Sequence, residues 1–215
     1  MTAEWSLGEV EALARKAARG AGCSWGLAEE AGRAVRWLAA RGLPGPEALV
    51  ALLAWRDGLD HAAVVPVPGP EGWAGLSGPV CPIVAGAMLC DGLWPGGQGA
   101  LQLGPVVQPL LLLPFAAWLA QARRQALGLS WGETAVTLAP GGGLAHEGPM
   151  QCVTPARVRI GAEAMGRAAI AVPGNRARAD GAVVAALERL AARTYAPATE
   201  ASRLVGAGAG LSDND

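Results

Sequence analysis

The residues with the most suggestive chemistry lie in the stretch RTYAPATEASRLVGAGAGLSDND (193–215). It contains two arginines, a tyrosine, a serine and a glutamate close together. Arginine forms paired, charge-assisted hydrogen bonds with carboxylates and phosphates, and hydroxyl groups donate hydrogen bonds to the same anions. We therefore expect a binding site for a small anionic metabolite, lined by Arg193, Tyr195, Glu200, Ser202 and Arg203.

The same stretch also has a purely structural interpretation. Glu200 and Arg203 have the three-residue spacing of an ion pair on a helix, and Tyr195 could pack as part of an arm that completes an oligomer interface. Asp213 and Asp215 bring two carboxylates together and could bind a hard cation, although two carboxylates make a poor cage. We predict no metal site.

Few residues elsewhere could carry acid–base chemistry, since the only histidines are His61 and His146. His61 follows Asp60 in GLDHAAV, and a carboxylate beside an imidazole can orient it for proton transfer. His61 is therefore the candidate catalytic residue if the protein is an enzyme, and we place it at the start of a strand. His146, in GGGLAHEG, is predicted at an exposed hairpin tip.

The cysteines show no metal-binding spacing. Cys81 and Cys90 have strongly apolar neighbours in sequence, which predicts raised thiol pKa values and unreactive thiols. Free thiols favour a cytoplasmic protein. The four cysteines are Cys23, Cys81, Cys90 and Cys152.

The composition excludes several functional classes. GAGAGL (206–211) lacks the spacing of a dinucleotide-binding loop, and the one lysine, Lys16, is not in a phosphate-binding loop, so no cofactor is predicted. A net charge of −1 provides no general attraction for nucleic acid. The chain is 52% hydrophobic and 16% charged, which favours burial of an apolar surface in a homodimer.

One apolar stretch, LGPVVQPLLLLPFAAWLA (103–120), is barely long enough for a membrane span and contains three prolines and a glutamine. We predict an extended segment that leads into a buried helix, and no membrane association.

The pattern along the chain predicts an α+β protein: an N-terminal helical subdomain followed by a mixed or antiparallel sheet with packed helices and a C-terminal arm. Its predicted parts are residues 1–57, 58–193 and 194–215, within one compact unit. The first part reads as three helices, beginning with MTAEWSLGEVEALARKAARG and its Ser6–Glu9 capping box.

The remaining elements follow from local patterns. HAAVVPVPG, SGPVCPIVAGAMLCDG, ETAVTLA and RVRIGAE read as strands, whereas residues 114–126 and 181–194 read as helices.

Three stretches also support a family resemblance: EVEALARKAARGAGCSWGLAEEAGRAVRWLAARGLPG (9–45), LGPVVQPLLLLPF (103–115) and the C-terminal stretch quoted above. The chain resembles an uncharacterised, mainly alphaproteobacterial family known only by a domain-of-unknown-function label. The resemblance spans nearly the whole chain and implies no activity or catalytic residues.

Two functional hypotheses follow. The first is a bacterial, cytoplasmic protein that binds an anionic small metabolite, with or without catalysis. The second is a non-catalytic homo-oligomeric assembly protein whose C-terminal arm completes an interface.

Overall fold

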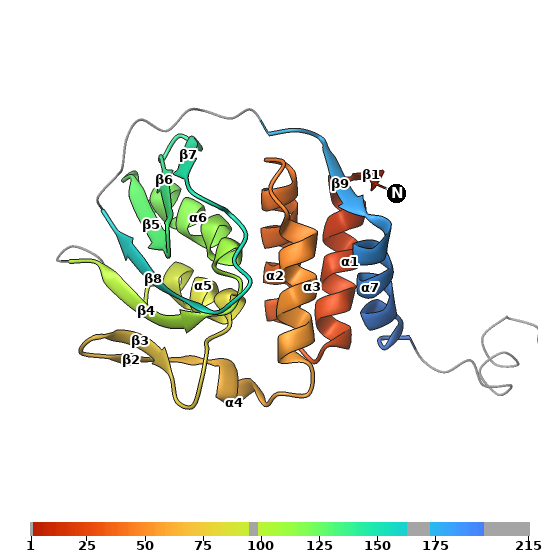
Figure 1. The fold of residues 1–215 in the computed structure, drawn as a ribbon, viewed down its shortest axis with the longest axis horizontal. Helices are drawn as coiled ribbons and strands as arrows, with labels where there is room; N and C mark the ends of the chain where they lie inside the picture. The colour runs from red at the N-terminus through yellow and green to blue at the C-terminus, as the bar shows by residue number, and fades with distance from the viewer. Residues whose placement is uncertain (1, 95–98, 163–172, 196–215) are drawn as a thin grey trace, which may run out of the picture.

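A computed structural model describes residues 2–94, 99–162 and 173–195. It confirms the α+β class, with a group of long helices beside a seven-stranded mixed sheet (Figure 1). Helices α5 (Pro82–Cys90) and α6 (Leu113–Arg123) lie between the sheet and the long helix α2 (Figure 1).

The helical group consists of α1 (Leu7–Gly20), α2 (Trp25–Ala39), α3 (Gly45–Arg56) and α7 (Gly181–Ala192). The predicted capping box at the start of α1 is confirmed: Ser6 N donates to Glu9 Oε2 at 2.8 Å, and Glu9 N donates to Ser6 Oγ at 3.2 Å. Ser24 caps α2 with a single bond, in which its hydroxyl accepts a hydrogen bond from Leu27 N.

The N-terminal segment differs from the prediction, because the first helix does not include its first residues. Thr2–Ser6 form strand β1, which pairs antiparallel with β9 (Arg176–Asp180). Local sequence cannot reveal this pairing, because paired residues of the two strands are at least 170 positions apart in the chain.

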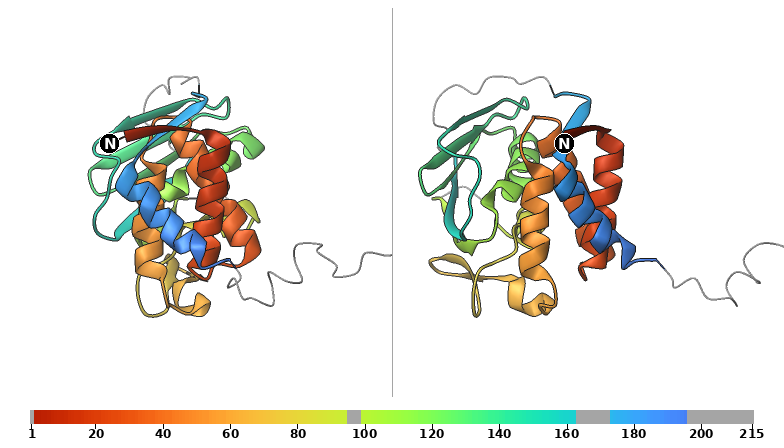
Figure 2. Two further views of the ribbon diagram at one scale, coloured as in Figure 1. Left: turned by 90° about the vertical axis from the view of Figure 1, so that its right-hand side faces the viewer. Right: turned by 45° about the vertical axis from the view of Figure 1, so that its right-hand side comes forward.

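Helix α7 packs against α1, and the two lie side by side in Figure 2. The approach is close at Gly20, where a Cβ atom would overlap the carbonyl oxygen of Leu190. The division into residues 1–57, 58–193 and 194–215 stays a prediction. However, β9 and α7 belong to its second part and pack against helices of its first.

The large sheet has the strand order β2-β3-β4-β8-β5-β6-β7, in which only the β3–β4 pair is parallel. The predicted strands in ETAVTLA and RVRIGAE are confirmed as β6 and β8. The seven strands are β2 (Pro66–Gly69), β3 (Gly72–Gly75), β4 (Leu101–Val106), β5 (Leu127–Trp131), β6 (Thr134–Leu138), β7 (Leu144–Glu147) and β8 (Ala156–Gly161).

The stretch SGPVCPIVAGAMLCDG was predicted as strands, and this was wrong, because Pro82–Cys90 form helix α5. Proline fits the first turn of a helix, where its missing N–H costs nothing. The helix is apolar on every side because it is buried, so it lacks the alternation of polar and apolar faces that identifies an exposed helix. Gly86 lets the Phe115 ring pack directly against its backbone.

The apolar stretch from residue 103 is extended in β4 and then enters the short 3₁₀ helix η1 (Pro109–Leu112) and helix α6, as predicted. Leu111, Leu112 and Phe115 are fully buried in the core. Within the described residues, no helix combines the length and the apolar character needed to cross a bilayer.

Both histidines lie in elements other than those predicted. His61 begins the four-residue helix α4 (His61–Val64) rather than a strand, because Asp60 Oδ1 accepts a hydrogen bond from Ala62 N at 3.1 Å and starts the turn. His146 lies within strand β7, opposite Val136, rather than at a hairpin tip, and its side chain is exposed.

Candidate functional site

A basic pocket of about 720 Å³ lies where the C-terminal ends of α1 and α7 meet the N-terminal end of α2. Four of its lining side chains are basic and one, Glu29, is acidic. The residues that line this pocket are Arg15, Lys16, Arg19, Gly20, Gly22, Trp25, Glu29, Arg193, Thr194 and Tyr195.

Each arginine of the basic pocket also has a partner in the protein. Arg15 Nη1 donates to Glu29 Oε1 at 3.2 Å, and Arg193 Nη1 donates to Asp57 Oδ1 at 2.7 Å. The guanidinium of Arg19 donates to the carbonyl oxygen of Cys23. Hydrogen bonding to Arg193 lowers the pKa of the Asp57 carboxyl, so this pair is ionised at neutral pH.

Lys16 differs from these arginines. Among the described residues it has no ion pair, and its ammonium nitrogen lies 5.9 Å from the centre of the Tyr195 ring. On another wall, Arg19 stacks over the exposed ring of Trp25 at 4.5 Å. Among the residues that the structure describes, the basic pocket therefore presents one cation without an ion pair, Lys16, and two aromatic surfaces.

The structure brings two of the predicted site residues to this pocket, because Arg193 and Tyr195 both line it. Glu200, Ser202 and Arg203 lie outside the described residues. His61 is exposed and is not among the residues that line the basic pocket.

Sequence analysis missed the α1 and α2 side of the pocket. Arg15 and Arg19 were not considered, and Lys16 was considered only for a phosphate-binding loop, although the three basic residues cluster in the last turns of α1. Trp25, at the first position of α2, was also missed, and its side chain is 70% exposed.

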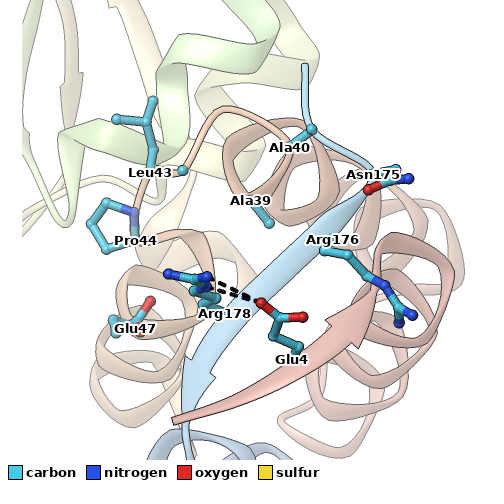
Figure 3. A pocket seen from close by; sticks show the side chains of 11 residues that line it. Glu4, Ala39, Ala40, Leu43, Pro44, Glu47, Asn175, Arg176 and Arg178 are labelled. Atoms are coloured by element: carbon cyan, nitrogen blue, oxygen red, sulfur yellow. Dashed lines mark hydrogen bonds and ion pairs between the residues drawn. The ribbon is translucent and has the colours of Figure 1, made fainter. Parts of the chain in front are cut away.

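A second pocket of about 640 Å³ lies beside the β1–β9 pair and the start of α3 (Figure 3). Its charges are balanced: Glu4 pairs with Arg178 at 3.1 Å, and Glu47 and Arg176 are the other charged residues that line it. Because it has no excess of either charge, it selects for an anion less strongly than the basic pocket does.

The thiols fit the predicted pKa directions. Burial raises the pKa of Cys81, and it raises that of Cys90 to about 11. Cys90 is nevertheless an exposed residue at the end of α5, and its thiol donates to the carbonyl oxygen of Phe115. The described residues contain no cluster of three or more histidine, cysteine or acidic side chains that could hold a metal ion.

Comparison with known proteins gives one match. No curated protein and no solved structure matches the chain. A family match covers residues 5–75, a segment that contains α1, α2 and α3 and the first of the three stretches on which the resemblance was based. The taxonomic range of the family stays a prediction. The family is described as "Protein of unknown function (DUF3726)", so the match confirms the resemblance to a family known only by a domain-of-unknown-function label.

Proposed function

We propose that the protein binds a small anionic metabolite, with a carboxylate or phosphate group, in the basic pocket. The observation that carries this proposal is the convergence of four basic side chains on one cavity of about 720 Å³, in which Glu29 is the single acidic side chain among the described residues; the basic ones are Arg15, Lys16, Arg19 and Arg193. Pockets of this size accommodate metabolites and drug-sized molecules.

Lys16 is the central contact in this proposal. The three arginines already donate to Glu29, Cys23 and Asp57, so a ligand would share them, whereas Lys16 has no carboxylate partner among the described residues. An unpaired ammonium group gains most from an incoming anion, because no existing ion pair must be broken. Tyr195, whose ring centre lies 5.9 Å from the Lys16 ammonium nitrogen, carries a hydroxyl group that can donate a further hydrogen bond.

The other predicted ligand-binding residues follow Tyr195 closely in the sequence, and we propose that they contribute to the same pocket. Glu200, Ser202 and Arg203 follow Tyr195 within eight residues. An extended chain covers about 3.5 Å per residue, so this segment is long enough to reach the pocket and add Arg203 and Ser202 as donors.

The experiment is a thermal-shift screen of the full chain against panels of carboxylates, phosphates and divalent metal ions. A ligand at a hundred times its Kd stabilises the folded protein by about 2.7 kcal/mol, which raises the melting temperature by several degrees. Lys16→Gln should weaken binding of a stabilising anion by about tenfold to a hundredfold, since hydrogen bonds to charged groups contribute about 1.5–3 kcal/mol.

The matched control is Arg157→Gln, which removes one positive charge from the exposed side of β8, outside the residues that line the pocket. Equal weakening by both substitutions would indicate a general charge effect and contradict the proposed site. If no anion stabilises the protein, the proposal is wrong.

Two further predictions start from the outcome of this screen, one if a ligand is found and one if none binds. If the protein is an enzyme, His61 is the proposed proton carrier, and His61→Gln should then lower turnover without weakening binding. If truncation after Val205 dissociates an oligomer and no ligand binds, the proposed alternative holds: a homo-oligomeric assembly protein completed by its C-terminal arm.

A further inference from the structure

A separate cavity of about 440 Å³ is lined by residues of α1, α2 and α6. Among the described residues, it shares no lining residue with the basic pocket, so the two are distinct sites. Three arginines and two tryptophans line it, together with a single acidic side chain within the same part of the chain. We call it the arginine–tryptophan pocket and define it by Glu11, Arg33, Arg36, Trp37, Arg41 and Trp118.

The spacing along α2 gathers most of these side chains on one side of the helix. Arg33, Trp37 and Arg41 are four residues apart, and residues at this spacing are neighbours on a helix surface. Arg41 Nη1 donates to the carbonyl oxygen of Trp37 at 3.2 Å, which continues the row past the end of α2. Trp118 comes from α6, and the guanidinium group of Arg33 lies over its ring at 4.9 Å.

The three arginines differ in their partners. Arg36 Nη1 lies 2.7 Å from Glu11 Oε2, and Arg33 pairs with a glutamate one turn earlier on α2 at 3.0 Å. Arg41 has no ion pair among the described residues. Its guanidinium group lies over the Trp37 ring at 3.7 Å, and its Nε atom is buried without a hydrogen-bond partner. An aromatic ring and a backbone carbonyl are therefore the neighbours that balance its charge in the described structure.

Arg41 is consequently the arginine that gains most from an added anion. Burial lowers the pKa of its guanidinium group, because the charged form loses hydration, although an arginine stays protonated in proteins. A carboxylate or phosphate beside it would replace the lost hydration with charge-assisted hydrogen bonds. The excess of arginines over acidic side chains in the described lining favours an anion over a cation.

The two tryptophans make the pocket suitable for a flat ring. The ring of Trp118 meets that of the fully buried Phe115 edge to face, with the ring centres 5.1 Å apart, so the core fixes its position. Both indoles stack with guanidinium groups in this structure. A planar aromatic ligand can stack on an indole or on a guanidinium group in the same manner.

We propose that the arginine–tryptophan pocket binds a small aromatic anion, a molecule in which a flat ring carries a carboxylate or phosphate group. The ring stacks within the set of indoles and guanidinium groups, and the anionic group bonds to Arg41. A volume of about 440 Å³ is within the range of small-molecule pockets. This site goes beyond the proposed function, because it does not depend on anion binding in the basic pocket.

The test is isothermal titration calorimetry of the full chain with two matched sets of ligands. One set is indoleacetate, indoleacetamide and cyclohexylacetate, and the other is adenosine monophosphate, adenosine and ribose phosphate. Each set contains an aromatic anion, its uncharged relative and an anion without the aromatic ring. In at least one set the aromatic anion should bind about tenfold tighter than both relatives, because the charged hydrogen bonds and the stacking each contribute about that factor. The set with the tighter anion shows whether the pocket prefers carboxylate or phosphate.

Nitrogen–proton correlation spectra of the indole N–H groups locate the bound ligand in the unmodified chain. The signals of Trp37 and Trp118 should shift during the titration. The signal of Trp25 should stay in place, because Trp25 lines the basic pocket. Shifts at Trp25 without shifts at the other two would place the ligand in the basic pocket and overturn the inference.

Arg41→Gln should weaken binding of the aromatic anion by about tenfold to a hundredfold, and its circular dichroism spectrum shows whether it folds. Arg157→Gln is the matched control, since it removes the same charge from an exposed position on β8 and should leave binding unchanged. The inference is overturned if no aromatic anion binds, if the uncharged relative or the anion without an aromatic ring binds as tightly, or if both substitutions weaken binding equally.

Discussion

Packing of α7 on α1 builds one side of the basic pocket, and the substitution Gly20→Ala tests this packing directly. Gly20 is the last residue of α1 and also lines the pocket. A Cβ atom there would overlap the carbonyl oxygen of Leu190 and lie 2.7 Å from its carbonyl carbon. Because the obstacle is the backbone of α7 rather than the end of a flexible side chain, the two helices must separate to admit the methyl group.

The cost can be estimated from known overpacked interiors, where one added methyl group destabilises by about 1–3 kcal/mol. For a chain of this size 1 kcal/mol corresponds to about 2–4 °C in melting temperature, so Gly20→Ala should lower it by about 2–12 °C. Helix propensity alone predicts the opposite sign, because alanine favours a helix over glycine by up to about 1 kcal/mol.

Gly8→Ala supplies the matched control. Gly8 lies in the same helix, is exposed, and has no atom within 4 Å of the position that a Cβ would occupy. This variant should melt at the same temperature as the parent or up to about 4 °C higher. Thermal unfolding followed by circular dichroism at 222 nm compares the three proteins. If Gly20→Ala melts as high as Gly8→Ala, α7 does not contact α1 as described and the pocket loses its Arg193 wall.

Two pH-dependent predictions follow from the local electrostatics. Arg193 lowers the folded-state pKa of Asp57 below its ordinary value of 3.8, so the pair stabilises the folded protein above that pH and the stabilisation is lost as pH falls through the lowered pKa. The melting temperature of Asp57→Asn should therefore lie below that of the parent by a constant amount between about pH 5 and 7. This difference should shrink below pH 3.8, where the carboxyl group of the parent becomes protonated. A difference that persists to lower pH would contradict the pairing. The pKa of Cys90 is about 11, so its alkylation rate, measured by peptide mass spectrometry, should rise about tenfold per pH unit until close to that pH, whereas a plateau near the ordinary value of 9.0 would show an unperturbed thiol.

The parts of the fold that were predicted correctly are those whose signals are local. The Ser6–Glu9 capping box and the helix predicted for residues 181–194 each depend on signals within one segment, and both are confirmed. In such segments apolar residues recur with the helical period, so the sequence indicates which face of the helix packs against the core.

Prediction from the sequence was wrong where burial removes the contrast between polar and apolar faces. Helix α5 consists of PIVAGAMLC and is covered by its neighbours, so both helix and strand were compatible with its composition. Strands β1 and β9 went unrecognised for a different reason: each is short and polar on one side, and only pairing with the other makes it a strand.

Only part of the candidate site was predicted, again because sequence patterns report local features and not contacts between distant segments. Arg193 and Tyr195 drew attention because they belong to a chemically unusual stretch. Arg15, Lys16 and Arg19 did not, because basic residues near the end of a helix are common and complement its dipole. Only the packing of α7 against α1 makes them neighbours of Arg193, and no local pattern encodes that contact.

The composition of the basic pocket also limits what the family match can mean for function. The matched segment, residues 5–75, supplies Lys16, Arg19 and Trp25, whereas Arg193 and Tyr195 directly follow α7. A protein that resembled this chain only over the matched segment would lack the wall that contains Tyr195. Anion binding should therefore follow the presence of an α7-like helix, packed at a glycine equivalent to Gly20, rather than the family match alone. Deleting residues 181–215 from this chain should abolish anion binding even if α1, α2 and α3 stay folded.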